Sequence, residues 1–456
     1  MATKWYRFLN LELSNAPLIV FRIIFGALML FGSIRFVLKG WVHDLYIAPE
    51  FHFGYYGFEW VKPLPGDWMY LPFIILILSA IGILLGFKYR FSALLFFLAF
   101  TYVELLDKTN YLNHYYFVSL MAFLMIWVPA NKRFSIDAWL NPNMYENSCR
   151  RYAIFILQFQ LAIVYVFAGI AKLEPDWLLE AQPLRIWLQA HSSMPVFGDL
   201  LDQKWVAYLF SWFGCIYDLF IVFFLWNNRF RKYAYILVIL FHFITWYLLP
   251  IGVFPWVMIF STLIFFPAEF HEQIIEQIKK LLPFQARKST NTSPNKPLSQ
   301  LGRFAIGIFI FLQLVIPFRY CLYPGNLFWN EEGFRFSWRV MLMHKEGHAT
   351  FYIRDPKTKG EIEIQNRDYL TETQIDQMAT QPDMILQYAQ FLKQKYDHRQ
   401  FHFGNKHLTL NNPSVHAEIY VSLNGRPSQL FVEKKHDLTQ LPYNLAHRTW
   451  IAPFKK

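Results

Sequence analysis

The sequence predicts an α-helical integral membrane domain with about nine spans, followed by an extracytoplasmic α+β, β-rich domain. The composition is the first reason: the 456 residues are 55% hydrophobic and 16% charged, whereas soluble domains carry about 25% charged residues. The second reason is that long apolar runs continue almost to Pro324 and Gly325, after which the chain becomes polar. We therefore expect a multi-span transmembrane domain at 1–325 and a soluble domain at 326–456.

The apolar runs have the length of membrane spans. A spanning helix needs about 17–25 predominantly apolar residues, and some of the runs here are short or adjoin one another. The N-terminus has no short apolar region followed by a small-residue cleavage site, so the first run is expected to be an uncleaved span. The runs lie near 17–36, 67–87, 91–106, 113–130, 152–172, 204–226, 232–249, 253–268 and 304–323.

Basic residues indicate how these spans are oriented. They occur in alternate loops, and cytoplasmic loops are enriched in Lys and Arg. The N-terminus is therefore expected in the cytoplasm and 330–456 outside, as in a multi-pass protein of a bacterial inner membrane. These loops also account for the net charge of +11, and no nucleic-acid partner is expected. The basic positions are Lys4, Arg7, Lys88, Arg90, Lys132, Arg133, Arg150, Arg151, Arg229, Arg231, Lys232, Lys279, Lys280, Arg287, Lys288 and Lys296.

Periodicity predicts the elements of the C-terminal domain. In 416–425 ("HAEIYVSLNG") apolar residues alternate with polar ones before an Asn-Gly turn, which is typical of a half-buried strand. The segment 351–365 ("FYIRDPKTKGEIEIQ") predicts a hairpin around Asp355-Pro356. The segment 371–396 predicts a helix with Thr371 or Thr373 as its cap.

Polar residues from distant segments are expected to meet on the extracytoplasmic face. The segment 104–116 ("ELLDKTNYLNHYY") bridges spans three and four, and Lys172 ends span five on the same side. The segments 44–60 and 328–341 also lie there, which is the arrangement of helices built around one pocket. His242 falls inside span seven, where an ionisable residue is costly and points to function.

Each of these residues also has a purely structural interpretation. A lysine at the end of a span commonly acts as an anchor that reaches for the membrane surface. His114 could be an interfacial residue, and His242 could be satisfied by a neighbouring helix. A catalytic base, in contrast, needs an uncharged amine, which burial favours; the apolar helix end before Lys172 would provide that burial. The sequence alone leaves both interpretations open.

Three blocks of this sequence resemble one known family. They are "LLDKTNYLNHYYFVSLMAFLM", "FAGIAKLEPDWL", and "GNLFWNEEGFRFSWRVML" followed by "RDYLT", "DMILQYA" and "EIYVSLNGR". Together they are similar to the vitamin K-dependent gamma-glutamyl carboxylases, including bacterial members whose membrane part is called the HTTM domain. The resemblance covers nearly the whole chain in order.

The resemblance implies a reaction and a role for each matching residue. Lys172 would deprotonate vitamin K hydroquinone, which reacts with O2 to give a strongly basic epoxide alkoxide. That base would remove a γ-proton from a glutamate of an exported peptide, and the carbanion would add CO2; no metal is expected. Asn113 and His114 would complete the catalytic set. The expected cofactor-binding residues are Asp107, Tyr111, His242, Trp329, Phe334, Ser337, Trp338 and Met341.

Departures from the family pattern keep other functions open. Phe334 stands where vertebrate members have a tyrosine, and Tyr320 where a histidine is common. The three cysteines are far apart and form no CxxC motif, so no zinc site or disulfide framework is expected. The alternatives are a quinol epoxidase that has lost carboxylation, a non-catalytic quinone- or lipid-binding scaffold in the bilayer, and, last, a transporter. The natural substrate and the oligomeric state do not follow from the sequence.

The alternation of basic loops predicts opposite compartments for two reporter fusions. A reporter fused after Lys232 should be in the cytoplasm, because that loop is basic, and one fused after Gly333 should be outside. Alkaline phosphatase and green fluorescent protein, each fused at both positions, measure this. The same compartment for both positions would contradict the predicted topology.

Overall fold

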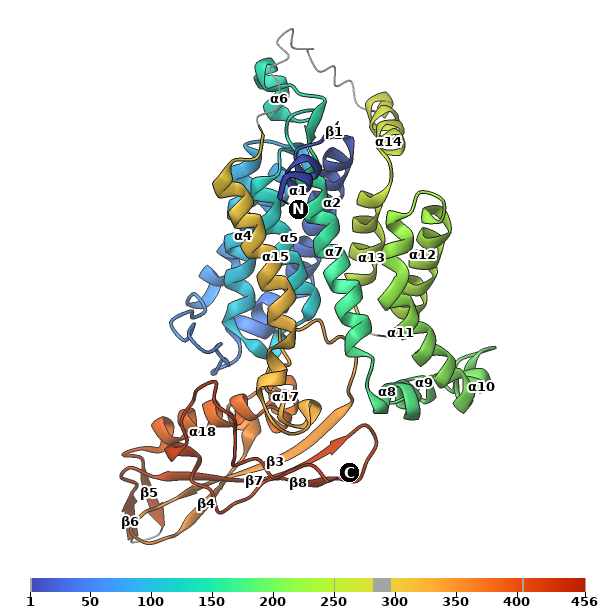
Figure 1. Cartoon of the computed structure of the whole chain (residues 1–456). Coiled ribbons are helices and arrows are strands. Elements are labelled where there is room, and N and C mark those ends of the chain that lie inside the picture. Colours follow the sequence, from blue (N-terminus) through green and yellow to red (C-terminus); the bar gives the residue numbers. More distant parts are fainter. Residues whose placement is uncertain (1, 250, 282–296, 404–405, 456) are drawn as a thin grey trace.

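A helical bundle carries a sheet-containing domain at one end (Figure 1). The structure is a computed structural model, and it describes residues 2–249, 251–281, 297–403 and 406–455. The long helices of the bundle are α2 (Ala16–Leu38), α3 (Tyr70–Leu85), α4 (Tyr89–Leu106), α5 (Asn113–Trp127), α7 (Arg151–Ala171), α11 (Lys204–Trp226), α12 (Arg231–Leu248) and α15 (Gln300–Val315). The shorter helices are α1 (Ala2–Leu9), α6 (Ile136–Leu140), α8 (Pro175–Glu180), α9 (Leu184–Gln189), α10 (Gly198–Leu201), α13 (Phe254–Ser261), α14 (Ala268–Leu281) and α16 (Leu327–Asn330).

The number of candidate spans in the structure is lower than the sequence predicted. Within the described residues, six helices are long and apolar enough to cross a membrane, or seven if one bent pair counts as a span. The expected count of nine is therefore not confirmed. The run at 113–130 forms only the 15 residues of α5. The run at 253–268 forms α13 and a 3-10 turn, bent by 116° against α14.

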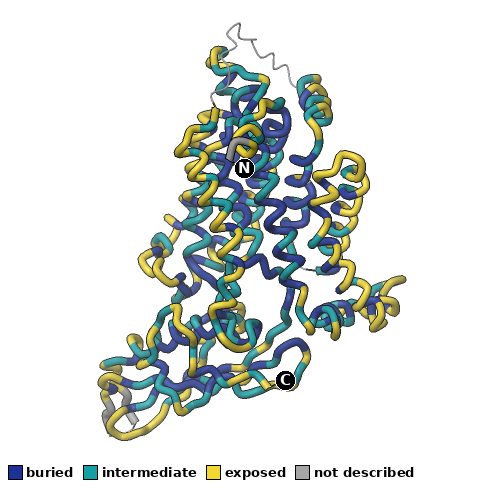
Figure 2. The backbone as a smooth tube through the Cα atoms, viewed as in Figure 1, coloured by how far each residue is buried: buried dark blue, intermediate teal, exposed yellow. Residues whose placement is uncertain are grey.

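The surface of the bundle is apolar, as a lipid-facing surface should be. Large apolar side chains are exposed along α11 and α12, among them Trp212, Phe220 and Ile236. Figure 2 shows the exposed residues on the outside of the bundle and the buried residues in its centre. Exposed apolar area of this extent marks a membrane or partner contact. The protein is therefore a multi-pass membrane protein.

The basic loops next to α1, α6 and α14 gather at the end of the bundle opposite the sheet domain (Figure 1). Arg287, Lys288 and Lys296 lie outside the described residues. Arg133 pairs with Glu272, its Nη1 lying 2.7 Å from Oε1, and the Lys132 ammonium lies 2.8 Å from the Glu146 carboxylate. The backbone N–H of Lys88 donates to Asp137 at 2.7 Å. Loops that are distant in the sequence thus share this end.

The C-terminal domain is an antiparallel sheet packed against two helices. The strand order is β4 (Glu361–Ile364), β3 (Lys345–Arg354), β7 (Ser414–Leu423), β8 (Gln429–Val432). The predicted strand and hairpin are confirmed by β7 and by β3 with β4. Ala417, Ile419, Val421 and Leu423 are buried, because alternate side chains of a strand point to the same face. Two further short pairs are β1 (Glu12–Ser14) with β2 (Ser148–Arg150), and β5 (Gln400–Phe403) with β6 (Lys406–Thr409).

The predicted helix at 371–396 is two helices. Thr371 caps α17 (Glu372–Thr380) in a reciprocal arrangement with Gln374, as predicted. A break at Gln381 precedes α18 (Pro382–Tyr396). Proline disfavours helical backbone in the residue before it and lacks an N–H, so it starts helices rather than continuing them.

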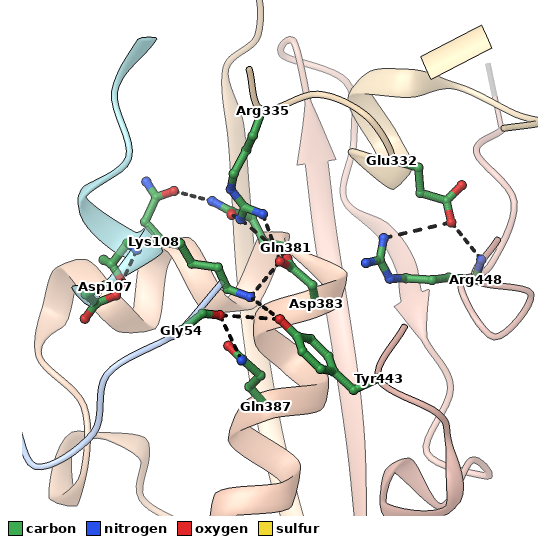
Figure 3. A network of polar contacts seen from close by, with 12 residues as sticks. Gly54, Asp107, Lys108, Glu332, Arg335, Gln381, Asp383, Gln387, Tyr443 and Arg448 are labelled. Carbon is green, nitrogen blue, oxygen red and sulfur yellow. Dashed lines mark hydrogen bonds and ion pairs between the residues drawn. The ribbon is translucent and has the colours of Figure 1, made fainter. Parts of the chain in front are cut away.

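A buried ionic network joins the two domains (Figure 3). The carboxylate of Asp383 in α18 lies 2.6 Å from the Lys108 ammonium and 2.8 Å from the Arg335 guanidinium. Lys108 also donates to the Tyr443 hydroxyl at 3.3 Å. Burial lowers the pKa of Lys108 to about 8. Burial alone would raise the pKa of Asp383, but the charges of Arg335 and Lys108 hold it well below its ordinary value.

This network predicts a large effect for one substitution. Asp383→Asn removes the anion and leaves two buried cations unpaired, so the free energy of unfolding should fall by about 3–5 kcal/mol. Thermal unfolding of the detergent-solubilised protein measures the loss. The matched control is Glu50→Gln, since Glu50 pairs with Lys395 between the same domains but is half-exposed. That exposed pair should contribute at most about 1 kcal/mol, and equal losses in both variants would contradict the prediction.

Candidate active site in the membrane domain

Lys172 ends α7 and turns its side chain into the protein. Its backbone N–H donates to the Gly169 carbonyl at 3.0 Å, and the helix cannot continue because Pro175 begins α8. The side chain runs back along α7, so that Nζ lies 3.4 Å from the Ala168 carbonyl oxygen. Lys172 is only 6% exposed. A surface anchor would extend its ammonium away from the apolar region, which this side chain does not do.

The partner of Lys172 is Asp218 of α11. Lys172 Nζ lies 2.6 Å from Asp218 Oδ2, and both side chains are almost fully buried. Close packing of the two helices makes this contact possible: a Cβ atom added at Gly169 would lie 2.6 Å from the backbone nitrogen of Leu219. Only glycine at 169 therefore lets α7 approach α11 this closely.

The Lys172–Asp218 pair lies in the wall of an apolar cavity, which we call the lysine chamber. It is bounded by α7, α8, α9, α11, α12, α13 and residues Val340 and Met341. A second polar contact lies further along it, where the Tyr165 hydroxyl is 3.1 Å from Nε2 of His242. The remaining wall is mostly aliphatic and aromatic. Apolar walls with a few convergent polar groups are the usual form of a small-molecule site.

His114 does not line the lysine chamber. It borders a neighbouring apolar cavity, the histidine chamber, between α2, α3, α4, α5 and Phe254. The Phe254 ring stacks on the His114 ring with 5.2 Å between centroids, and Phe254 lines both chambers. The structure therefore does not place His114 and Lys172 in the single pocket that was expected: they line two cavities that share Phe254.

A third cavity, the vestibule, adjoins both chambers at the end of the bundle that faces the sheet domain. It is lined by Asn113, His114, Phe334 and Met341. It shares Phe254, Val340 and Met341 with the lysine chamber. The segment 334–343 thus forms part of the wall of both cavities.

Asn113 and Tyr111 hold this segment in place. The Asn113 amide donates to the Arg339 carbonyl at 2.8 Å. The Tyr111 hydroxyl donates to Asn113 Oδ1 at 2.9 Å and accepts from the backbone N–H of Phe336 at 2.7 Å. These contacts orient the segment that borders the lysine chamber.

Asp107 is placed at the junction with the C-terminal domain. Its carboxylate accepts from the backbone N–H of Thr109 at 2.9 Å and from the Gln374 amide at 3.0 Å. Burial raises the pKa of this carboxyl, and the hydrogen bonds from Thr109 oppose that rise. Asp107 lines none of the three cavities.

Three further candidates also lie away from the cavity walls. Trp329 packs in the core of the C-terminal domain, and its indole N–H donates to the Ala452 carbonyl at 2.7 Å. Trp338 stacks on Tyr116 with 4.9 Å between ring centroids. Ser337 donates to the Phe334 carbonyl. Their contacts are those of packing residues, because each side chain is directed into protein.

The sequence analysis missed Asp218 and Tyr165. Asp218 is the lone acidic residue within the apolar sequence of α11, and such a residue is itself a signal of function. Glu104 of α4 is a second missed case; its carboxylate accepts from Ser119 and borders the histidine chamber. Tyr165 carries no comparable signal, since tyrosine is common in membrane helices. Across the described residues, no cluster of three or more His, Cys, Asp or Glu is arranged to hold a metal ion.

Comparison with known proteins agrees with this arrangement. The model of the HTTM domain matches residues 10–270. The model of the vitamin K-dependent gamma-carboxylase lumenal domain matches residues 298–456, so it includes α15 as well as the sheet domain. A lumenal domain fits an extracytoplasmic position for the C-terminal region. No solved structure matches the chain. The two matches cover the bundle and the sheet domain in order, and the chain therefore belongs to the vitamin K-dependent gamma-carboxylase family.

Proposed function

We propose that this protein couples the oxygenation of vitamin K hydroquinone to its epoxide with the carboxylation of peptidyl glutamate to γ-carboxyglutamate. The observation that carries the proposal is a buried lysine in the wall of an apolar chamber, 2.6 Å from a buried carboxylate. The family supplies a carboxylase-like function. The lysine chamber supplies an apolar place where a quinol could be deprotonated.

The lysine chamber fits the head of a quinol. Aromatic and aliphatic side chains such as Phe241 and Met258 would contact the rings, and Lys172 would face a ring hydroxyl. The apolar lining favours the chemistry, because water would quench a strongly basic alkoxide. Vitamin K hydroquinone would be consumed as a co-substrate together with O2 and CO2, and the proposed steps need no metal.

The vestibule is the proposed entrance for the glutamyl peptide. It lies beside Asn113 and His114 and reaches the lysine chamber past Met341. An exported peptide would approach from the side of the sheet domain. His114 would stabilise negative charge that develops at the quinone, and Asn113 would keep the segment 334–343 in register with it.

One observation favours a second candidate function. Phe334 lines the vestibule where vertebrate relatives are expected to carry a tyrosine hydroxyl. A missing hydroxyl at the entrance would weaken the handling of the peptide or of CO2 without affecting Lys172. The second candidate is therefore quinol epoxidation without carboxylation. A quinone- or lipid-binding scaffold without turnover remains the third.

An assay of the purified protein separates these functions. The protein is incubated with reduced vitamin K, a glutamyl peptide and labelled bicarbonate, and epoxide and peptide-bound label are measured separately. Both products support the proposal, and epoxide alone supports the second candidate. If folded protein binds vitamin K but forms neither product, the result supports the non-catalytic binding scaffold.

The role of Lys172 predicts that a conservative substitution abolishes activity. Lys172→Arg keeps the positive charge, but a guanidinium is not deprotonated in proteins and cannot act as a base. Epoxide formation should fall by about 10²–10⁴-fold, and a small exogenous amine should partly restore Lys172→Ala. The matched control is Lys395→Arg in an exposed pair, which should be unaffected. Near-normal epoxide formation by folded Lys172→Arg protein would contradict the role of Lys172 as a base.

His114→Ala should impair epoxide formation in a different way. The substitution removes an imidazole from the neighbouring chamber, so stabilisation of developing negative charge is lost while the base remains. Added amine should therefore fail to restore the rate, in contrast to Lys172→Ala. Initial rates with and without amine measure this. Equal rescue of both variants would contradict separate roles for the two residues.

A further inference from the structure

We infer that the base is the Lys172–Asp218 pair rather than Lys172 alone, and that Asp218 holds the proton that Lys172 must release before it can accept one from the quinol. The inference rests on the proposed function and names a proton-holding role for a residue that the sequence analysis did not single out. Asp218 acts through Lys172 and is therefore a positioning residue.

The geometry isolates this pair from other charges. Lys172 Nζ and Asp218 Oδ2 are 2.6 Å apart, with side-chain exposures of 8% and 7%. Among the described residues, neither side chain forms another ion pair. The Trp177 ring, with its centroid 5.4 Å from Nζ, and the Ala168 carbonyl are uncharged neighbours. Each charge in the chamber therefore depends on the other for compensation.

The other titratable side chains near the pair come from α7, α11 and α12. They are Tyr165 of α7, Cys215 and Tyr217 of α11, and His242 of α12. The Cys215 thiol contacts the Gly169 carbonyl at 3.8 Å, and Tyr165 contacts His242. The part of the segment 334–343 that faces the chamber, Val340 and Met341, is apolar. None of these groups brings a second carboxylate or ammonium to the pair.

An ion pair at this distance poses a problem for a base. An ammonium has no lone pair and cannot accept a proton from a quinol. A lone ammonium or carboxylate would also be costly to bury. The pair solves both difficulties, because one proton can move between its members without changing its net charge.

The proton transfers balance as follows. The N–H bond of the Lys172 ammonium breaks, and the proton forms an O–H bond with Asp218 Oδ2, leaving a neutral amine and a neutral acid. The amine lone pair then takes the hydroxyl proton of the quinol. At the end Lys172 is again an ammonium, Asp218 is a carboxylic acid, and the positive pair faces the quinol anion. No electrons leave or enter the quinol in these steps.

Asparagine at 218 tests this role because it preserves shape and a hydrogen-bond acceptor but cannot hold the proton. A structural role for Asp218, in which it only orients Lys172, predicts that Asp218→Asn behaves like the unsubstituted protein. A proton-holding role predicts a change in the protonation of Lys172 itself. Asp218→Glu keeps the carboxylate and serves as the conservative variant.

The first experiment reads the protonation of Lys172 without quinol turnover. The full-length protein is treated with dinitrofluorobenzene, which reacts with neutral amines, between pH 6 and 9, and labelling of Lys172 is measured by mass spectrometry. Without its carboxylate the buried amine should be mainly uncharged, so Asp218→Asn should label Lys172 at least tenfold faster at pH 7. Asp218→Glu should resemble the unsubstituted protein. Equal labelling of all three proteins would overturn the inference.

Lys108 provides a matched internal reference for this measurement. It is a buried lysine whose Nζ is also 2.6 Å from an aspartate oxygen, that of Asp383, but it lies outside the lysine chamber. Its labelling should be the same in all three proteins. A parallel change at Lys108 would mean that Asp218→Asn loosens the whole fold, and the faster labelling of Lys172 would then count against the inference.

The second experiment measures epoxide formation and the binding of oxidised vitamin K in the same proteins. Epoxide formation by Asp218→Asn should fall as the pH is lowered from 9 to 6, because a proton on its Lys172 no longer has an acceptor, while binding stays unchanged. The rates of the unsubstituted protein and of Asp218→Glu should vary less over this range, because one proton can move within the pair. The same pH dependence in all three proteins would overturn the inference and leave the proposed function standing. If the unsubstituted protein forms no epoxide, the proposed function fails, and the labelling still decides whether Asp218 controls the proton on Lys172.

Discussion

The close contact of α7 with α11 is the constraint on which the rest of the site depends. Gly169 allows the two helices to approach closely, and this brings Lys172 and Asp218 near enough to form an ion pair. Either residue alone would place an uncompensated charge in an apolar interior. Because the pair is neutral overall, the surrounding walls can remain apolar. The same walls make the chamber suitable for a lipid-like ring system.

The second constraint is the attachment of the C-terminal domain. Asp383 ties α18 to Lys108, which follows α4, and to Arg335, which lies within the segment 334–343. That segment borders both the vestibule and the lysine chamber and is held by Asn113 through the Arg339 carbonyl. The sheet domain is therefore part of the structure of the site, because it fixes one wall of the chamber. A membrane domain without it would leave that wall unsupported.

The sequence predicted local features better than distant contacts. The alternation in 417–423 identified a strand, and the end of an apolar run identified Lys172, because both depend on neighbouring residues. Asp218 lies far from Lys172 in the chain, and no spacing rule reports which helices pack together. The assignment of Trp329 to the cofactor pocket stays untested. In the structure this residue packs in the core of the C-terminal domain. A motif predicts that an apolar residue is buried, but it does not say whether the residue is buried in a cavity wall or in the core of a domain. The count of nine spans was not confirmed, because hydropathy shows neither how much of an apolar run forms one helix nor where a helix bends.

The position of Asp218 also bears on why a lysine stands at the end of α7. An anchor needs only a long stem and a charge that reaches water, and a buried carboxylate beside it would add nothing. Replacing a buried ion pair by apolar residues of similar volume is often neutral or stabilising, so stability alone gives little reason to keep this one. Both members are nearly inaccessible, and both line the lysine chamber. A costly pair placed where the proposed function requires proton transfer is best understood as part of that chemistry.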